Sequence, residues 1–389
     1  MSANTRSFGR PRPSEISGGG GITFLTDVTF LRRRPPQDLP PPTGPSPFRL
    51  DLADVVSADV INAISTARKM VFHICGDTGG VKSPEPQQIV VDHMEEDLKK
   101  TPGQIEETPV FFYMLGDCVY YNGAEVDYYP QFYQPYEFYN APIFAVPGNH
   151  DGDPLPPATT LTGFVKNFCA PAPVITDDAR DSNRTAMTQP NVHWTLLTPL
   201  ATIIGLYSNV PEGGFIGDAQ LQWFIGELRD ADPDKPVFVT MHHPPFSADD
   251  FHSGSPQMRT ALDQAFQAAQ RHPEIVFAGH VHAYERFTRS TPNGQIPYIV
   301  AGAGGYWHLH RMADIDGDRP VTPLTLDQDG EPITFERYVD TRHSFMRIEV
   351  TADRVFGKCF TVPRPTESWS APARLADRFA LDWRAHRFV

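Results

Sequence analysis

The 389-residue sequence predicts an α/β fold. From about residue 50 onward, short apolar runs rich in Val, Ile and Phe alternate with longer amphipathic segments, as strands and helices do in this class. Each of these apolar runs ends directly in polar residues. Because ligands of open α/β sheets bind beyond the carboxyl ends of the strands, the polar ends predict one shared site.

Five apolar runs are predicted to be buried strands, because β-branched and aromatic residues dominate them. Their sequences are KMVFHIC (69–75), PVFFYML (109–115), PIFAVP (142–147), PVFVTM (236–241) and EIVFAG (274–279). Near the carboxyl terminus, the runs SFMRIEV and RVFGKCFTV flank residues 351–353, and this pattern predicts a β-hairpin.

Four amphipathic segments are predicted to be helices because their apolar residues recur at helical spacing. They are residues 53–68, 87–100, 218–231 and 256–271. In the third segment, Asp218 is the expected N-cap, since a short acidic side chain accepts hydrogen bonds from the first free backbone amides.

Changes in composition divide the chain into three parts and mark one insertion. Residues 1–49 are rich in Gly and Pro and predict a mobile arm or strap, residues 50–362 form the main domain, and residues 363–389 form a C-terminal extension, either a surface helix or an extended segment. Residues 153–190 are a long excursion, which acts either as a lid or as a packing insertion. The insertion offers three cations to an anionic substrate, namely Lys166, Arg180 and Arg184.

The composition excludes several classes of protein. The formal net charge is −14, and a chain this acidic repels nucleic-acid backbones, so we expect no nucleic-acid partner. We expect no membrane span, because no apolar stretch approaches roughly 18 residues. The cysteines form no C-x-x-C pair, and we expect four reduced, buried thiols and a cytoplasmic location. They are Cys75, Cys118, Cys169 and Cys359.

The polar residues at the strand ends are suited to binding metal ions. Their carboxylate, amide and imidazole groups suit iron, manganese and zinc. Six such donors are more than one structural zinc needs, and paired ions are the usual clamp for phosphoryl displacement, so two ions are expected. The six donors are Asp77, Asp117, Asn149, His242, His280 and His282.

Five sequence blocks, in this order, resemble the signature of the calcineurin-like metallophosphoesterases. They are GD-x-G, GD-x-x-Y, GNHD, an MH pair after an apolar run, and GHVHAYER, and they lie within residues 76–286. The last block is especially similar to purple acid phosphatases. The resemblance implies a four-layer α-β-β-α sandwich with two mixed β-sheets in the main domain. It also implies a pair of divalent or trivalent ions, iron with iron, manganese or zinc, and a small phosphorylated substrate.

The resemblance implies two groups of ligands that share the bridging carboxylate of Asp117. The first group is Asp77, Tyr120 and His282, and the second is Asn149, His242 and His280. Gly79 stands where many members of the family have a His ligand, and purple acid phosphatases use a Tyr instead, which matches Tyr120. Beyond the metals, His150 is expected to protonate the leaving group, and His252 falls near another outer His of the family.

Each assignment has an alternative. Asp77 and Asp117 are compatible with ordinary turns after strands, Tyr120 with a core aromatic, and His252 with a solvated loop residue. His243 competes with His242 for the ligand role, and Cys118 is either redox-sensitive or packed.

The predicted activity is hydrolysis of phosphate esters, with monoesters favoured, by a metal-activated hydroxide. Alternatives are hydrolysis of cyclic-nucleotide or other diesters, a protein Ser/Thr phosphatase and a non-catalytic metal-binding scaffold. The Ser/Thr phosphatases carry an Arg in their second block, which GDCVYY lacks.

Overall fold

Two mixed β-sheets form the centre of the fold in a computed structural model, which describes residues 34–101, 103–153, 161–328 and 330–389. The nine-stranded sheet has the order β1-β5-β6-β7-β8-β10-β9-β12-β11. Its strands are β1 (Arg49–Asp51), β5 (Trp194–Leu197), β6 (Thr202–Gly205), β7 (Val237–Met241), β8 (Ile275–Ala278), β9 (Tyr284–Thr291), β10 (Gly294–Ala301), β11 (Leu324–Gln328) and β12 (Glu331–Val339).

The seven-stranded sheet has the order β16-β15-β14-β13-β2-β3-β4. Its strands are β2 (Lys69–Cys75), β3 (Pro109–Met114), β4 (Ile143–Ala145), β13 (Ser344–Thr351), β14 (Arg354–Thr361), β15 (Arg374–Asp382) and β16 (Arg387–Phe388). Strands β2, β3 and β4 are parallel to one another, and so are β6, β7 and β8 in the other sheet. Each parallel set therefore ends at one edge of its sheet.

The two sheets pack face to face through aromatic and aliphatic side chains. Phe72 of β2 stacks on Phe111 of β3, with 4.7 Å between the ring centroids, and lies 6.3 Å from Phe238 of β7. All three side chains are fully buried. The rings therefore join the parallel strands of one sheet to those of the other, and this fixes the relative position of the strand ends.

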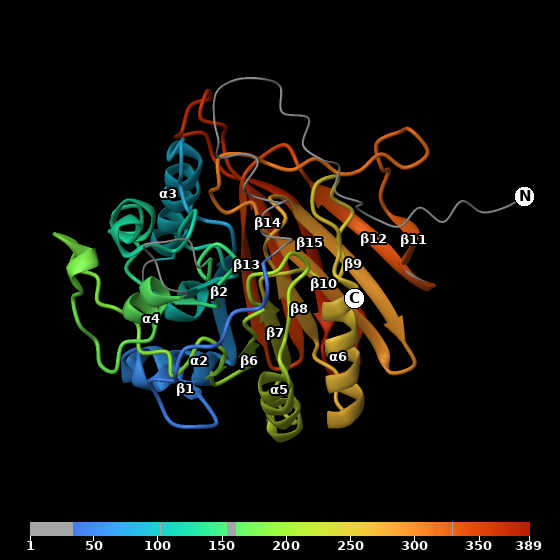
Figure 1. Cartoon of the computed structure of the whole chain (residues 1–389), viewed down its shortest axis with the longest axis horizontal. Coiled ribbons are helices and arrows are strands. Elements are labelled where there is room, and N and C mark those ends of the chain that lie inside the picture. The colour runs from blue at the N-terminus through green and yellow to red at the C-terminus, as the bar shows by residue number, and fades with distance from the viewer. Residues whose placement is uncertain (1–33, 102, 154–160, 329) are drawn as a thin grey trace, which may run out of the picture.

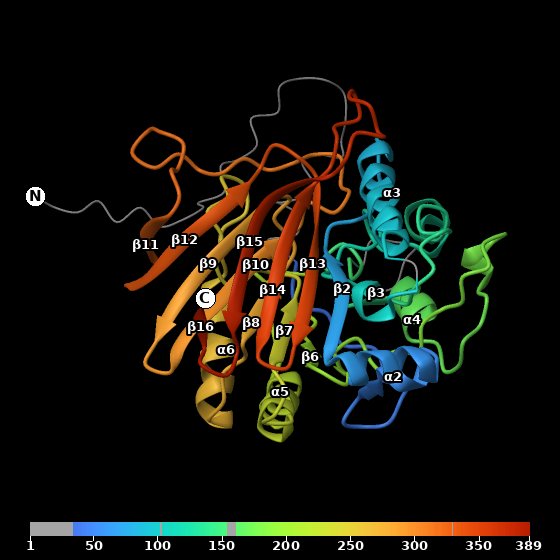
Figure 2. The ribbon, with the colours of Figure 1, turned by 180° about the vertical axis from the view of Figure 1, so that it is seen from behind.

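Helices cover the outer faces of both sheets. Helices α5 (Asp218–Asp230) and α6 (Pro256–Ala269) share a core with β6, β7, β8 and β10. Helices α3 (Glu85–Lys99) and α4 (Thr162–Phe168) share another core with β3 and β4. Figure 1 shows α5 and α6 side by side, and Figure 2 shows α3 and α4 next to β2 and β3. The predicted four-layer sandwich with two mixed sheets is confirmed.

All five predicted strands and the hairpin are present, with ends that shift by one or two residues. The segment predicted as one helix at 53–68 contains a short 3-10 turn (Leu52–Asp54) followed by α2 (Ala58–Ala67). Asp218 is not the N-cap of α5: Gly217 occupies that position in an extended conformation, and Asp218 is the first helical residue. There its charge still faces the positive end of the helix.

The C-terminal tail is extended rather than helical. Residues 374–382 form β15, which pairs antiparallel with β14, so the helix alternative for residues 363–389 is wrong. At the other end, β1 pairs parallel with β5. Residues 1–33 of the predicted arm lie outside the described residues, and the three-part division of the chain stays a prediction.

The three cations of the insertion contact neighbouring residues of the fold. Lys166 forms ion pairs with Glu125 and Asp178 at 2.6 and 2.7 Å. Arg184 donates hydrogen bonds to the backbone carbonyls of Tyr136, Tyr139 and Ala141, and Arg180 lies over the ring of Tyr129. The structure thus contradicts a substrate-binding role for Lys166 and Arg184, and the described part of the insertion packs through α4. Residues 154–160 lie outside the described residues.

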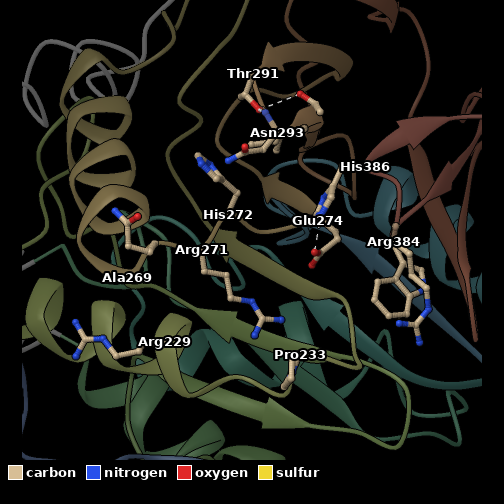
Figure 3. Close-up of a pocket in the computed structure, with 14 residues that line it drawn as sticks. Arg229, Pro233, Ala269, Arg271, His272, Glu274, Thr291, Asn293, Arg384 and His386 are labelled. Atoms are coloured by element: carbon tan, nitrogen blue, oxygen red, sulfur yellow. Dashed lines mark hydrogen bonds and ion pairs between the residues drawn. The ribbon is translucent and has the colours of Figure 1, made fainter.

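A cleft of about 500 Å³ lies at the opposite end of the sheets from the polar strand ends, where β7 and β8 begin (Figure 3). Arg271 lines the cleft and donates hydrogen bonds to the carbonyls of Ala231 and Asp232, directly beyond α5. Basic side chains there complement the negative carboxyl ends of α5 and α6. Arg271 therefore has a structural role at the end of α5.

The predictions about cysteines and membrane helices can be compared with the described residues. All four cysteines are buried and unpaired, as predicted. In the described ranges, no helix has both the length and the apolar character that crossing a membrane requires.

Candidate metal centre

The seven predicted ligands lie in the loops that follow five strands, and these loops meet at one buried place. Each of the seven predicted ligands has at most 7% of its surface exposed. They come from loops after β2 (Asp77), β3 (Asp117 and Tyr120), β4 (Asn149), β7 (His242) and β8 (His280 and His282). The predicted residues are therefore gathered in one place, although their role as ligands stays a prediction.

The first group consists of Asp77, Tyr120 and His282. The Tyr120 hydroxyl lies 3.3 Å from Asp77 Oδ1 and 3.4 Å from His282 Nε2, and these last two atoms are 3.5 Å apart. Donor atoms about 2.0–2.2 Å from one tetrahedral ion lie about 3.3–3.6 Å from each other. The triangle therefore has the size that a single metal ion requires.

The second group surrounds His242 Nε2. This atom lies 2.9 Å from Asn149 Oδ1, 3.2 Å from His280 Nδ1 and 3.4 Å from Asp117 Oδ2. Ligand atoms of Asp77, Asp117 and His242 all lie within 4.8 Å of one another, so the second group adjoins the first. Asp117 is placed between them, as a bridging carboxylate would be.

Hydrogen bonds at the far side of each ring hold the histidines in place. His242 Nδ1 donates to the Leu115 carbonyl and His282 Nδ1 donates to the His308 carbonyl, both at 2.9 Å. In each neutral ring, Nε2 is then an unprotonated acceptor that faces the centre. These bonds orient the two rings as metal ligands are oriented in other proteins.

The charges at the centre favour a cation. Burial raises the pKa of Asp77 to about 7, and the neighbouring Asp117 carboxylate adds to the effect. Burial alone would raise the pKa of Asp117 as well, but His242 and His150 hold it below its usual range. Burial disfavours a charged His242, yet Asp117 raises the pKa of that imidazole to about 9. Two buried carboxylates thus draw positive charge to this place, which fits a pair of metal ions.

The backbone is held in unusual conformations at three of these residues. Asp77, Asp117 and His280 have φ values of 57°, 50° and 70°, in the left-handed region that ordinary residues rarely occupy. Strained backbone of this kind persists only where the surroundings hold it in place, and it concentrates at functional sites. An ordinary turn does not explain three such residues in one buried cluster.

Close backbone packing adds to this constraint. A Cβ atom on Gly148 would lie 2.1 Å from Asp117 Oδ1, and a Cβ atom on Gly302 would lie 2.6 Å from Asp77 Oδ2. The loops therefore approach the two carboxylates more closely than any side chain allows.

His150 and His252 lie beside the ligand groups. The backbone amide of His150 donates to Asp117 Oδ1 at 2.9 Å, and its ring Nδ1 donates to the Tyr121 carbonyl at 2.7 Å. Because Nδ1 is engaged, Nε2 is the atom of His150 that exchanges a proton. His252 is only 7% exposed, so the solvated alternative is wrong, and its ring lies 4.0 Å from that of His280.

The structure also distinguishes between the alternatives for His243, Cys118 and Tyr120. His243 Nδ1 is 2.8 Å from the hydroxyl of Ser208, so that nitrogen is turned away from the group around His242. Burial raises the pKa of the Cys118 thiol, which supports a packed thiol over a redox-sensitive one. The Tyr120 ring is buried, but its hydroxyl faces Asp77 and His282, so its surroundings are not those of an ordinary core aromatic.

Three supporting residues were missed by the sequence reasoning. Asp151 accepts hydrogen bonds from the backbone amides of Cys118, Val119 and Gly148, and so joins the loops after β3 and β4. Gln131 bonds both the amide and the carbonyl of Tyr120, at 2.9 and 2.7 Å.

The third is Glu212, whose Oε1 lies 2.9 Å from His252 Nδ1 and 3.5 Å from His280 Nε2. The acidic end of GNHD was a signal for Asp151, and the apolar run 203–206 was a signal for the strand that leads to Glu212.

A known protein family matches the part of the chain that contains this site. The model of the family described as calcineurin-like phosphoesterase matches residues 70–284. This segment is more than half of the chain, and it contains all nine predicted site residues.

Curated relatives with detectable similarity include plant enzymes. Purple acid phosphatase 21 of Arabidopsis thaliana is 39% identical over 94 residues, which are 22% of this chain and 21% of that protein. Purple acid phosphatase 23 of the same plant is 29% identical over 173 residues, which are 42% of this chain and 34% of that protein. The chain thus matches about a fifth to a third of the length of these relatives.

Among solved structures, the purple acid phosphatase PPD1 from yellow lupin seeds has a similar fold. The TM-score is 0.58 at 16% identity, over 82% of this chain and 55% of that chain. At this identity the likeness shows the fold, which is two mixed sheets with helices outside them.

Proposed function

Because the chain belongs to the calcineurin-like phosphoesterase family, we propose that it hydrolyses phosphate esters, monoesters above all, with two metal ions. One observation carries this proposal: seven buried side chains with oxygen or nitrogen donor atoms lie in two adjoining groups, and Asp117 lies next to both. Ligand sets of oxygen and imidazole suit iron paired with iron, manganese or zinc. The similarity to purple acid phosphatases supports monoesters as the substrate class.

The ions and the side chains have separate tasks in this proposal. Two ions in these groups would neutralise charge on the phosphate oxygens and lower the pKa of a bound water toward about 7. Asp117 sets the spacing of the two groups. His150 holds a proton on Nε2 and delivers it to the leaving alkoxide, while its amide bond to Asp117 keeps the ring beside the centre. His252 lies next to His280, in position to orient a phosphate oxygen.

Tyr120 gives the proposal a spectroscopic signature. Burial, together with the charges of Asp117 and Asp77, raises the pKa of the free Tyr120 hydroxyl, so the phenolate needs a strong cation beside it. We expect ferric iron in the first group to give a visible charge-transfer band that Tyr120→Phe abolishes. A colourless, active, iron-free enzyme would remove iron from the proposal and leave the hydrolysis in place.

Asp117→Asn tests the two-ion arrangement. We expect the variant to lose bound metal and most of its turnover of a chromogenic phosphate monoester, because one residue serves both groups. His150→Ala should keep both ions and lose about 10²–10⁴-fold in rate. Asp377→Asn is the matched control, since that carboxylate bonds Tyr284 and Arg286 away from the centre. Full activity of Asp117→Asn with two bound ions would refute the scheme.

The other substrate classes are separated by a panel. Metal-loaded protein is assayed with phosphomonoesters, cyclic nucleotides, other diesters and a phosphoserine peptide, with metal analysis in parallel. Faster turnover of diesters would replace the monoester proposal, and turnover of the peptide alone would indicate a protein phosphatase. Two bound ions without any hydrolysis would indicate a scaffold. A cytoplasmic location belongs to the same proposal, and the four buried, unpaired thiols support it.

A further inference from the structure

The carboxylate of Glu212 lies between two histidines that have different tasks. Its Oε1 is 2.9 Å from Nδ1 of His252 and 3.5 Å from Nε2 of His280. The side chain is 12% exposed, and within the described part of the chain its Oε2 is buried without a hydrogen-bond partner. A largely buried carboxylate that contacts two histidines of one site has a defined place there.

A tight loop after β6 fixes the position of the Glu212 carboxylate. The amide of Gly214 donates to the Pro211 carbonyl at 2.7 Å, and the amide of Phe215 donates to the Ser208 carbonyl at 2.8 Å. Gly213 and Gly214 have φ values of 82° and 76°, so the turn requires glycine at both positions. Glu212 therefore projects from a short, closed turn, and its carboxylate is pre-positioned.

The three histidines among the proposed ligands differ in what holds their outer nitrogen. His242 and His282 donate to backbone carbonyls, whereas His280 faces the carboxylate of Glu212. A carboxylate fixes the tautomer as a carbonyl does, and it also raises the basicity of the ring. His280 is therefore the one ligand of the three whose strength depends on a charged partner.

A cation bound in the second group would assign the contact between His280 and Glu212 to hydrogen bonding. His242 Nδ1 donates to a carbonyl, and His242 Nε2 lies 3.2 Å from His280 Nδ1, so a cation in the second group would meet both of these inner nitrogens as acceptors. With Nδ1 of His280 directed at that cation, the proton of the neutral ring is on Nε2 and is donated to Glu212. A further ion at Glu212 would require His280 to give up both protons.

We propose that Glu212 is a positioning residue, which orients His280 toward the second ion and His252 toward the phosphate. This inference rests on the proposed function. It adds a residue from a sixth strand end, the loop after β6, to a site built from the other five. Loss of a carboxylate partner of this kind typically costs 10–100-fold in metal affinity or activity.

Metal affinity tests the contact with His280. Glu212→Gln keeps the shape of the side chain and removes its charge, and the dissociation constants of both ions are measured by titration with a competing chelator. We expect one ion to bind about 10–100-fold more weakly and the other to bind as in the wild type. Glu227→Gln is the matched control, because that buried carboxylate bonds Arg49 and Thr195 and should leave both affinities unchanged. Unchanged affinities in Glu212→Gln would overturn this half of the inference.

A double-mutant cycle tests the contact with His252. At metal concentrations that saturate both groups, Glu212→Gln should lower kcat/KM in the wild-type background and have little further effect in His252→Ala. Additive losses would overturn this half. A third ion per chain that Glu212→Gln releases would overturn the hydrogen-bond assignment.

The wild-type protein measured alongside keeps the two proposals apart. Two bound ions and ester hydrolysis in the wild type, with an unaffected Glu212→Gln variant, refute only the role of Glu212. A wild type that binds no ions refutes the proposed function and this inference together.

Discussion

Replacing Gly148 by Ala places a methyl group against Asp117, the residue that we propose to bridge the two ions. The new Cβ would lie 2.1 Å from Asp117 Oδ1 and 2.3 Å from the backbone nitrogen of the same residue. Real Cβ atoms essentially never approach other atoms to less than 3.0 Å, so the two loops must separate by about 0.9 Å or more. The backbone nitrogen of Asp117 is part of this clash, so a different rotamer of the Asp117 side chain does not relieve it.

The expected losses follow from this displacement. Overpacking of a well-packed interior costs about 1–3 kcal/mol, which lowers Tm by a few degrees. A shift of about 1 Å at a reacting centre costs on the order of 10²-fold in rate. We therefore expect Gly148→Ala to fold, to lose metal on dialysis, and to lose at least about 100-fold in kcat for a chromogenic phosphate ester.

The control is Gly226→Ala in α5, where a Cβ atom would meet nothing within 4 Å. Ala favours a helix over Gly by about 1 kcal/mol, so this variant should be slightly more stable and fully active. The assays are metal content after dialysis, turnover at saturating substrate and thermal unfolding. Wild-type metal content and turnover in Gly148→Ala would refute the claim that close packing of the two loops fixes Asp117.

Three further predictions follow from residues outside the ligand groups. Arg184→Ala should lower the free energy of unfolding by about 2–4 kcal/mol with kcat/KM unchanged, because its guanidinium serves three backbone carbonyls; lost activity at unchanged stability would restore a substrate role. Gln131→Ala should weaken the visible band of an iron-loaded protein, since Gln131 holds both backbone groups of Tyr120; an unaltered spectrum contradicts this. Burial raises the pKa of Glu274 to about 7. Its stabilising contribution is therefore present below the unfolded pKa of about 4.5 and lost as the pH rises through 7. Glu274→Gln should be more stable than the wild type by about 1–3 kcal/mol at pH 8.5; equal unfolding curves at that pH would contradict the raised pKa.

The strands and most of the site follow from local patterns in the sequence. A buried parallel strand is a short run of β-branched and aromatic residues, and its carboxyl end is marked by an abrupt change to polar residues. Asp77, Asp117, Asn149 and His242 all lie within a few residues of such a change. Because parallel strands end at one edge of a sheet, the convergence of Asp77, Asp117 and Asn149 needed no knowledge of the long-range packing. Their meeting with His242 depends on how the two sheets pack against each other.

Glu212 could not be found in the same way. Strand β6 is only four residues long and ends at Gly205, and Glu212 lies seven positions further along, inside a loop. Its place depends on the turn closed by Gly213 and Gly214 and on contacts with distant histidines. Loop conformation of this kind is set by tertiary packing, which the local pattern does not contain.

Other errors have equally physical causes. The N-cap of α5 is decided by backbone dihedrals, so Gly217 takes the position although Asp218 is the better capping side chain. The tail at 374–382 is a strand because β14 offers it an edge to pair with. The direction in which Lys166 and Arg184 point depends on acidic groups and carbonyls far away in the sequence.

The placement of the ligand groups across both sheets has a consequence for the lifetime of the protein. Asp77, Asp117 and Asn149 extend from the seven-stranded sheet, while His242 and His280 extend from the nine-stranded one. Ions held between them would act as a reversible cross-link between the two halves of the sandwich. Binding at 100 times the dissociation constant would add about 2.7 kcal/mol per ion to the free energy of unfolding. Resistance to heat and to proteases should therefore follow the metal supply, and a chain deprived of metal should be degraded first.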